Sequence, residues 1–391
     1  MPDIKAIQKE LRAAKIDGWL FYDFRHSDPL AYSILGLNPA MATRRWFYLL
    51  PASGQPRKLV HRIESHNLDS LPGQKILYAG LDELQKALPK LLGRGKTLAM
   101  QYSPRNTIPY VSKVDAGTME LVRSYGKKIV SSAELVQMFE ARWSADQLST
   151  HLQAGRVIDR IILQAFGQVT AFLRQGKEIT EYELRQWMLQ QFRANLLIND
   201  DGPVVAVGAH SGDPHYEPNP ASSWPLREGE LLLLDVWAKT SAGHSVYYDV
   251  TWIAFLGAKV PEKYAKIFQI VKEARDAGVA FVQESVKQAR LIHGWEVDKA
   301  TRDVIRKAGY GKYFVHRTGH NIGTSVHGNG ANMDGLETRD DRPIIPHTCF
   351  SVEPGIYFPE FGIRSEVNVY VADRQARVTG AVQQEIIPIL A

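Results

Sequence analysis

The sequence has a single cysteine, Cys349, among its 391 residues. One thiol cannot form an intramolecular disulfide or a two-cysteine metal site. Such scarcity is typical of a reducing compartment, so we expect a cytoplasmic protein. No apolar run approaches the roughly 20 residues that span a membrane. The first residues are amphipathic and charged, unlike a secretory signal, so we expect no membrane partner.

Concentrated positive charge is also lacking. The net charge is +5, yet the densest basic runs are pairs such as Arg44-Arg45 and Lys127-Lys128. No Lys/Arg-rich helix and no basic patch with interleaved aromatic residues is present. Nucleic-acid binding is therefore not expected.

Several motifs that would indicate other enzyme classes are missing. The chain contains no GxSxG, HExxH or GxGxxG pattern, so it lacks the usual signatures of serine hydrolases, zincins and dinucleotide-binding enzymes. The run from Gly93 to Thr97 resembles the end of a phosphate-binding loop. Because Lys90 stands where that loop requires its first glycine, we interpret the run as a basic turn.

The length and the patterning predict two domains, since single domains usually hold roughly 100–250 residues. Residues 1–143 alternate helical and strand-like segments, which predicts an α/β domain. The expected elements are a helix at 4–14 and strands at 18–22, 46–51, 58–61, 75–78 and 97–102.

Residues 144–391 predict an α+β domain. Ser144 with Gln147, and Thr180 with Glu183, fit capping boxes that begin two helices. The expected elements are helices at 144–174, 180–192, 261–289 and 295–308, and strands at 230–237, 248–256, 348–353 and 363–371.

Four carboxylates within or at the ends of these strands, and one histidine in a glycine-containing segment, are candidate metal ligands. They are Asp235, Asp249, His320, Glu353 and Glu366. A carboxylate at the end of a buried strand is costly unless it is paired or bound to a metal. Taken singly, each of the five also fits an ordinary strand-end hydrogen bond, ion pair or structural histidine.

Strand periodicity groups further polar residues with these candidates. Alternation places Thr251 on the face of Asp249, where it could support a metal-bound carboxylate. It likewise places Arg364, Glu366 and Asn368 on one face. The glycines on either side of His320, Gly319 and Gly323, allow close backbone approach. His316, nearby, is interpreted as structural.

Together the candidates form a set of four carboxylates and one imidazole. Hard oxygen ligands with one nitrogen suit Mn²⁺, Zn²⁺, Co²⁺ or Fe²⁺. Two divalent cations would balance four negative charges, and a two-metal site can activate water and clamp a tetrahedral intermediate. We therefore expect two divalent metal ions, Mn²⁺ or Zn²⁺ foremost.

In this order and context, the five residues resemble the ligand set of the pita-bread metallopeptidases. This family includes Xaa-Pro dipeptidases (prolidases), aminopeptidase P, methionine aminopeptidases and the metal-free creatinases. The runs that resemble family signatures are His215-Tyr216, Thr318–Gly323, Val352–Gly355 and Arg364–Glu366. The resemblance covers nearly the whole chain and implies a creatinase-like domain at 1–143 and a pita-bread catalytic domain at 144–391. Methionine aminopeptidases usually lack the first of these.

The resemblance also implies metal-binding roles. Asp235 would bind the first metal, Asp249 and Glu366 would bridge both, and His320 and Glu353 would hold the second. Glu353 would also act as general base and general acid, moving a proton from water to the leaving proline nitrogen.

Further residues are expected at the substrate. His215 and His327 would bind it and stabilise the developing oxyanion. Arg364 would steady Glu366 or pair with the substrate carboxylate. Tyr248 is expected to contribute to substrate binding.

The sequence departs from the family pattern in three places. Asp235 and Asp249 are 14 positions apart (249 − 235), a longer connection than is usual among the relatives. We hypothesise that the added length, within Thr240–Tyr248, overhangs the site and shapes the substrate pocket. Trp252 stands where relatives often have arginine, and Gly328 follows His327 in place of the more usual glutamate.

These features predict an Xaa-Pro dipeptidase that acts on small proline-containing peptides. The first alternative is an aminopeptidase P acting on longer peptides, which shares the same ligands. A creatinase-like amidinohydrolase or a metal-free binding protein is less favoured, because all five ligands are retained. The resemblance further implies a homodimer.

Overall fold

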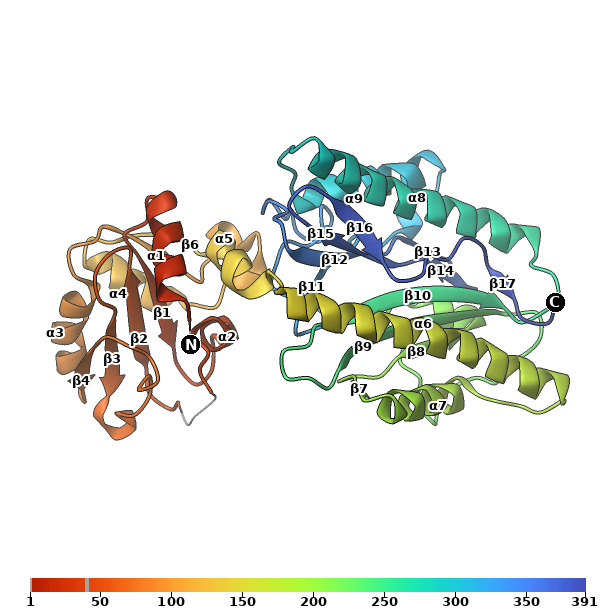
Figure 1. Ribbon diagram of the computed structural model, residues 1–391, viewed down its shortest axis with the longest axis horizontal. Helices are drawn as coiled ribbons and strands as arrows, with labels where there is room; N and C mark the ends of the chain where they lie inside the picture. Colours follow the sequence, from red (N-terminus) through yellow and green to blue (C-terminus); the bar gives the residue numbers. More distant parts are fainter. Residues whose placement is uncertain (1, 39–41) are drawn as a thin grey trace. The chain divides into compact units, whose positions relative to one another are not determined.

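The computed structural model describes residues 2–38 and 42–391. The chain divides into two compact units, Met1–Glu140 and Ala141–Ala391 (Figure 1). This division falls close to the boundary expected after residue 143.

The first unit is an α/β domain built on one six-stranded sheet with the order β4-β3-β2-β1-β5-β6. All strands run parallel except β2. Its strands are β1 (Gly18–Asp23), β2 (Trp46–Pro51), β3 (Arg57–His61), β4 (Gln74–Tyr78), β5 (Thr97–Met100) and β6 (Lys128–Ser131). Its helices are α1 (Ile4–Ala13), α2 (Pro29–Leu35), α3 (Leu81–Leu92), α4 (Ala116–Ser124) and α5 (Ala133–Val136).

Helices cover both faces of this sheet, and every residue of β1 is buried. Side chains of α1, α2 and α5 form one hydrophobic cluster with the sheet, and those of α3 and α4 form another. The five predicted strands of this unit are confirmed. A sheet buried on both faces produces nearly continuous apolar runs, as in β1 and β2, whereas β4 at the edge of the sheet is mostly exposed.

The second unit has four helices and two main sheets. The helices are α6 (Ala145–Arg174), α7 (Glu181–Ala194), α8 (Glu262–Lys287) and α9 (Gly294–Lys307). The strands are β7 (Leu197–Ile198), β8 (Val204–Val207), β9 (Leu231–Thr240), β10 (Tyr248–Phe255), β11 (Asn321–Ile322), β12 (Thr348–Val352), β13 (Gly355–Tyr357), β14 (Gly362–Arg364), β15 (Val367–Val371), β16 (Ala376–Thr379) and β17 (Ile387–Pro388). Both predicted capping boxes are present at the starts of α6 and α7.

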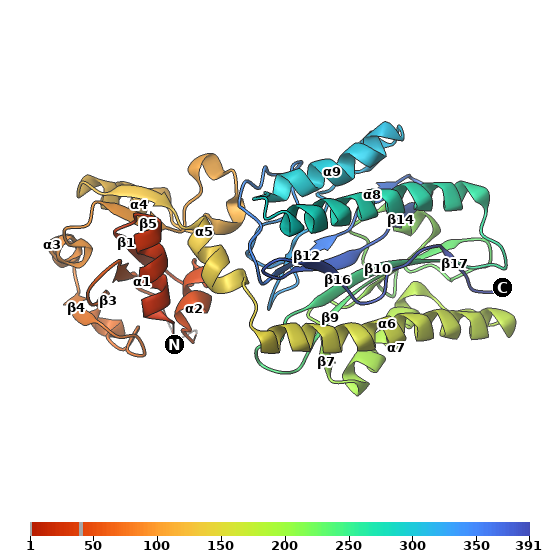
Figure 2. The same cartoon turned by 45° about the horizontal axis from the view of Figure 1, so that its top comes forward.

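The two main sheets have separate orders. One is β17-β10-β9-β7, with β8 also paired to β9, and the other is β11-β12-β15-β16. Helices α6 and α7 lie on one side of these sheets, and α8 and α9 lie on the other (Figures 1 and 2). This arrangement of helices around two sheets is the pita-bread α+β fold.

Alternation along β9 and β10 decides which side chains enter the core. Leu232, Leu234, Val236 and Ala238 pack in one hydrophobic cluster with α6 and α7. The residues between them in sequence, such as Asp235, therefore lie on the opposite face. That face carries the polar site described below.

One predicted strand, 363–371, is interrupted. Strand β14 ends at Arg364 and pairs with β13, whereas β15 begins at Val367 and pairs with β12. The chain changes partners at Ser365 and Glu366, so no single ladder continues through them. The predicted common face survives, because Arg364, Glu366 and Asn368 all form hydrogen bonds with residues of β10.

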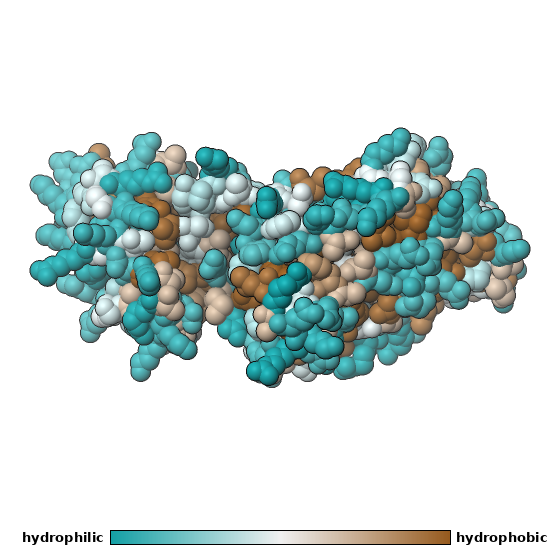
Figure 3. Space-filling view, turned by 90° about the horizontal axis from the view of Figure 1, so that it is seen from above, coloured by the Kyte–Doolittle hydropathy of each residue, from teal (hydrophilic) through white to brown (hydrophobic). Residues whose placement is uncertain are grey.

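The surface is mixed in character. On the face drawn in Figure 3, hydrophilic residues predominate and apolar residues form patches among them. Among the helices of the described residues, none combines the length and the apolar character that a membrane crossing requires.

Candidate metal centre

The structure brings the five predicted metal ligands to one cavity of about 660 Å³. Asp235 and Asp249 lie within β9 and β10, where Asp235 is opposite Thr251 in the antiparallel register. The other three ligands stand at strand ends of the second sheet. His320 immediately precedes β11, Glu353 immediately follows β12, and Glu366 immediately precedes β15.

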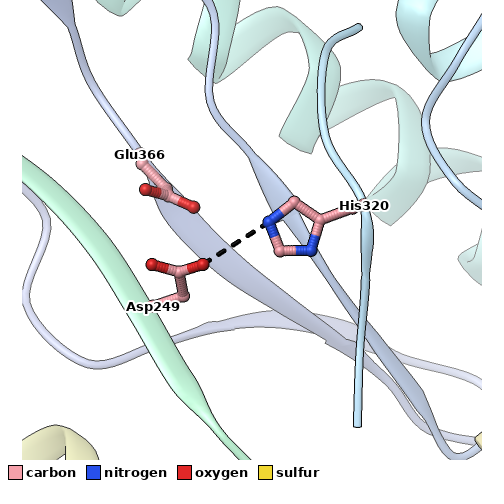
Figure 4. Close-up of side chains that lie close together, drawn as sticks. All are labelled: Asp249, His320 and Glu366. Carbon is pink, nitrogen blue, oxygen red and sulfur yellow. Dashed lines mark ion pairs between the residues drawn. The ribbon is translucent and has the colours of Figure 1, made fainter. Parts of the chain in front are cut away.

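Three of these side chains form the centre of the site. Ligand atoms of Asp249, His320 and Glu366 all lie within 4.8 Å of one another, and the three residues are buried. Figure 4 shows the three side chains pointing toward one another from separate segments. His320 Nε2 lies 3.4 Å from Asp249 Oδ2 and 3.4 Å from Glu353 Oε1, so Glu353 adds a third carboxylate to the group.

Thr251 and Arg364 hold two of the carboxylates in place. The Thr251 hydroxyl lies 3.2 Å from Asp235 Oδ1 and 2.9 Å from Glu366 Oε2. Arg364 donates through Nε to Thr251 and through a terminal nitrogen to Asp235 Oδ2. The predicted support of the carboxylates by Thr251 is thus present. Arg364 contacts Asp235 directly and reaches Glu366 only through Thr251.

The remaining ligands are positioned by side chains of the second sheet. Asn368 accepts from the backbone N–H of Asp249 at 3.3 Å and donates to its carbonyl at 2.7 Å. The Ser351 hydroxyl accepts from the His320 N–H at 2.9 Å and donates to Glu353 Oε1 at 3.0 Å. These bonds fix the backbone of Asp249 and His320 and the carboxylate of Glu353, so the predicted ligands are preorganised.

The donor set fits divalent cations. Asp249 Oδ1 and Glu366 Oε1 are buried and accept no hydrogen bond from the described residues. Burial, and then the neighbouring carboxylates, raise the pKa of both groups well above the ordinary range. A buried oxygen without a donor is costly. A divalent cation would satisfy both oxygens and neutralise the repulsion between the carboxylates.

Gly319 allows the strand approach that places His320. A Cβ at Gly319 would lie 1.9 Å from the Ser351 carbonyl oxygen, whereas the nearest atom to a Cβ at Gly323 is 3.8 Å away. The expected close approach is therefore present at Gly319 and absent at Gly323.

This contrast predicts unequal effects of two alanine substitutions. Gly319→Ala should destabilise the protein by about 1–3 kcal/mol, because the strands must separate, and should weaken metal binding. Gly323→Ala should change stability by no more than about 0.5 kcal/mol. Urea unfolding of both variants, with titration of Mn²⁺, measures the difference. Equal effects of the two substitutions would contradict this explanation.

Of the predicted substrate residues, His215, His327 and Arg364 border the cavity. The His215 and His327 side chains are exposed, and the rings of His320 and His327 lie 4.3 Å apart. The neighbouring His320 lowers the pKa of His327 to about 3, so this imidazole is neutral at neutral pH. All three nitrogens of Arg364 donate within the protein, to Thr251, Tyr357 and Asp235.

Tyr248 does not belong to the site, and the prediction that it binds substrate is wrong. Its ring is buried against α6, and its hydroxyl donates to Asp159 of that helix at 2.8 Å. Adjacent residues on a strand face opposite sides. Since Asp249 points into the cavity, Tyr248 must point away from it.

The connection between β9 and β10 also differs from the hypothesis. No residue of the segment 240–248 lines the cavity. The segment is held by the Tyr247 N–H, which donates to the Gly323 carbonyl at 3.0 Å. Its links toward the cavity are indirect: Val246 and Tyr247 belong to the hydrophobic cluster on which the cavity residues Trp237 and Val326 pack. The Tyr247 hydroxyl donates to Asp200 at 2.8 Å, next to the cavity residue Asp201.

A buried glutamate that the sequence did not reveal anchors the loop carrying His215. Glu181, in the first turn of α7, is fully buried. It accepts from the Val207 N–H at 2.8 Å, the Trp224 N–H at 2.7 Å and the Tyr216 hydroxyl at 2.5 Å, and contacts His210 Nδ1 at 2.9 Å. An acidic residue in the first turn of a helix is common, so nothing in the sequence distinguished it.

His316, interpreted from the sequence as structural, also borders the cavity. Its Nε2 lies 2.8 Å from the Tyr357 hydroxyl, which accepts from Arg364 at 3.2 Å. Burial lowers the pKa of His316 to about 3, so the ring is neutral at neutral pH. It therefore adds a polar, uncharged group beside the ligands.

Comparison with known proteins places these features in context. A sequence profile of metallopeptidase family M24 matches residues 151–373. The probable dipeptidase PepE of Mycobacterium tuberculosis is 30% identical over 238 residues, which are 61% of this chain and 58% of that protein. The Xaa-Pro dipeptidase of Lactobacillus helveticus is 34% identical over 164 residues, 42% of this chain and 40% of that protein.

These matches span about half the length of the curated relatives. A solved structure extends the likeness to the whole fold. The crystal structure of dipeptidase PepE from Mycobacterium ulcerans gives a TM-score of 0.73 at 23% identity, and the comparison covers 99% of this chain and 96% of that one. Both units of the chain therefore share the fold of this structure.

Proposed function

Because the chain belongs to metallopeptidase family M24, we propose that it hydrolyses the bond between a residue and a following proline in dipeptides. The observation that carries the proposal is the convergence of Asp235, Asp249, His320, Glu353 and Glu366 on one cavity. The dipeptidase names of the two curated relatives support the substrate class.

We propose two divalent ions at this centre, Mn²⁺ or Zn²⁺ foremost. Asp235 would bind the first, His320 and Glu353 the second, and Asp249 and Glu366 both. The free oxygens of Asp249 and Glu366 support this bridging role. When bound, such ions supply Lewis-acid activation of water and of the scissile carbonyl.

Glu353 is positioned to move the proton. Its Oε1 accepts from Ser351 and faces His320, which fixes the carboxylate at the edge of the cluster. In the proposed reaction Glu353 takes a proton from the attacking water as the oxygen–carbon bond forms. It then delivers the proton to the proline nitrogen as the carbon–nitrogen bond breaks.

The cavity histidines are suited to the developing oxyanion. His327 is neutral, and a neutral imidazole keeps one N–H to donate. His215 lies near His327 on a loop that Glu181 anchors through Tyr216. Donors that are fixed before the reaction stabilise charge in the transition state without reorganisation. Arg364 acts by holding Asp235 and Thr251, and through them the ligand geometry.

An aminopeptidase that acts on longer Xaa-Pro peptides is the second candidate. The cavity volume of about 660 Å³ favours it, because the space is ample for a small ligand and is not closed by the segment 240–248. The retained ligand set disfavours a creatinase-like amidinohydrolase or a metal-free binding protein. The family resemblance supports a homodimer, and light scattering on the purified protein tests the subunit number. The single cysteine supports a cytoplasmic protein.

The deciding experiment compares hydrolysis of an Xaa-Pro dipeptide with that of the matching Xaa-Pro-Xaa tripeptide in the presence of Mn²⁺. Asp249→Ala serves as the inactive control. Cleavage of the dipeptide alone supports the dipeptidase. Cleavage mainly of the tripeptide moves the assignment to an aminopeptidase, and no metal-dependent cleavage of either refutes both.

A further inference from the structure

Trp237 is a cavity residue to which the ligand pattern assigned no role. It stands two residues after Asp235 on β9 and lies directly opposite Asp249 in the register of β9 and β10. Residues at i and i+2 on a strand share a face, as do directly opposed residues of an antiparallel pair. The indole therefore lies beside two of the metal ligands, and it borders the cavity.

The indole has a fixed side and an open side. It packs with Val326 against a buried hydrophobic cluster that includes Tyr247 and Ile322. Both Trp237 and Val326 also line the cavity. These two apolar side chains pack on the same buried cluster and line the same cavity, where they form a wall beside His327.

The indole N–H has no partner. Trp237 Nε1 is buried and donates no hydrogen bond within the described residues. A buried indole N–H ordinarily finds an acceptor. Since this nitrogen is buried while the residue is half-buried, the carbon surface of the indole is what a ligand in the cavity can contact.

We propose that Trp237 and Val326 form the wall that receives the side chain of the residue before the scissile bond, and that the enzyme prefers a large apolar residue there. This inference rests on the proposed hydrolysis of Xaa-Pro bonds. It assigns the specificity for Xaa to Trp237.

In the proposed binding mode the amino end of the substrate lies at this wall, beside Asp201, one of the acidic residues that border the cavity. Asn199 donates to the Trp237 carbonyl, and it accepts from the Gly202 N–H. It thereby ties the loop of Asp201 to β9. Asp201 borders the cavity, and its negative charge suits a substrate ammonium group. Arg185, at the same rim, directs its guanidinium to the carbonyls of Asp201 and Pro218.

The cation suited to the carboxylate end lies on another segment. Arg317 borders the cavity next to His316. A dipeptide bound with its ammonium group toward Asp201 and its carboxylate toward Arg317 has its first side chain near Trp237. The wall then contacts Xaa and not the prolyl ring.

The size of the cavity determines the direction of the preference. A volume of about 660 Å³ remains with the indole in place, so Trp237 does not exclude a large side chain. A leucine side chain against the wall buries apolar surface that a glycine does not have. One apolar contact of this kind discriminates between substrates by roughly 10-fold or more.

The test compares kcat/KM for Leu-Pro and Gly-Pro in Mn²⁺-loaded wild-type enzyme and in Trp237→Ala and Trp237→Phe. The wild type should favour Leu-Pro. Trp237→Ala should lower the Leu-Pro to Gly-Pro ratio by roughly 10-fold, whereas Trp237→Phe, which keeps an aromatic face, should largely preserve it. If the alanine variant does not fold, Trp237→Leu should lower the ratio by a smaller factor.

Trp252→Ala is the matched control, because Trp252 lies on β10 and packs toward α6 away from the cavity. It should leave the ratio unchanged. A wild-type preference for Gly-Pro, or an unchanged ratio in Trp237→Ala with both rates reduced in proportion, overturns the inference and leaves the proposed function intact. A wild-type enzyme that cleaves neither dipeptide refutes the proposed function and, with it, this assignment.

Discussion

Replacing Glu353 with glutamine is expected to lower kcat for dipeptide hydrolysis by about 10²–10⁴-fold. Glutamine is nearly the same size and keeps an oxygen that can accept the bond from Ser351. It cannot take a proton from water or return one to the leaving nitrogen. The proton transfer is thus removed while the size of the side chain and its bond from Ser351 are preserved.

The matched control is Glu337→Gln. Glu337 borders the same cavity and accepts from the Arg317 N–H, and it lies outside the ligand cluster. Its variant should keep kcat within a few-fold of the wild type. Metal content measured on the same samples separates two roles of Glu353. A Glu353→Gln variant that keeps both metals and full kcat would show that another group moves the proton.

The fold could be predicted from the sequence where the periodicity is strong. In the first unit, β1, β2 and β3 were evident because strands buried on both faces form continuous apolar runs. The amphipathic helix α3 was missed, since Pro89 lies inside it and argues against a helix. The strand predicted over 363–371 was too long because its two halves pair with different strands, and such a change of partner leaves no local signal.

Strand alternation explains both the success and the failure at the candidate site. It correctly placed Thr251 beside Asp249, where the hydroxyl reaches Glu366. The same rule places Tyr248 on the other face, so its assignment to the substrate conflicted with information already in the sequence. Applied to β9, the rule also places Trp237 on the same face as Asp235. A search for metal ligands alone does not identify Trp237.

Other parts of the site depend on contacts between distant segments. Arg364 pairs with Asp235 across 129 residues of sequence, and no local pattern decides between this partner and Glu366. The bonds of Glu181 to Tyr216 and Trp224 likewise join separate segments. Such partners depend on the tertiary fold and leave no local pattern in the sequence.

Adding Mn²⁺ to metal-free protein is expected to raise its melting temperature, and Asp249→Asn should abolish the rise. A ligand that binds only the folded state stabilises it by about 2.7 kcal/mol at a concentration of 100 Kd. For a domain of about 250 residues this corresponds to a shift of roughly 5–10 °C. The cluster provides this binding energy only when assembled, because Asp235, Asp249 and Glu366 come from three separate strands or their ends.

Whether the wild type or the Asp249→Asn variant is the more stable protein should depend on whether metal is bound. In the metal-free protein, Asp249 is a buried carboxylate whose repulsion with neighbouring carboxylates raises the pKa of Glu366 as well as its own. Replacing it with the neutral amide removes that repulsion, so the metal-free variant should be at least as stable as the metal-free wild type. With saturating Mn²⁺ the wild type should be the more stable protein.

The control is Asp201→Asn, which replaces an exposed aspartate at the rim of the cavity and should keep the full Mn²⁺-induced shift of the melting temperature. If Asp249→Asn shows the same shift as the wild type, Asp249 is not a metal ligand, and the bridging role proposed for it is wrong.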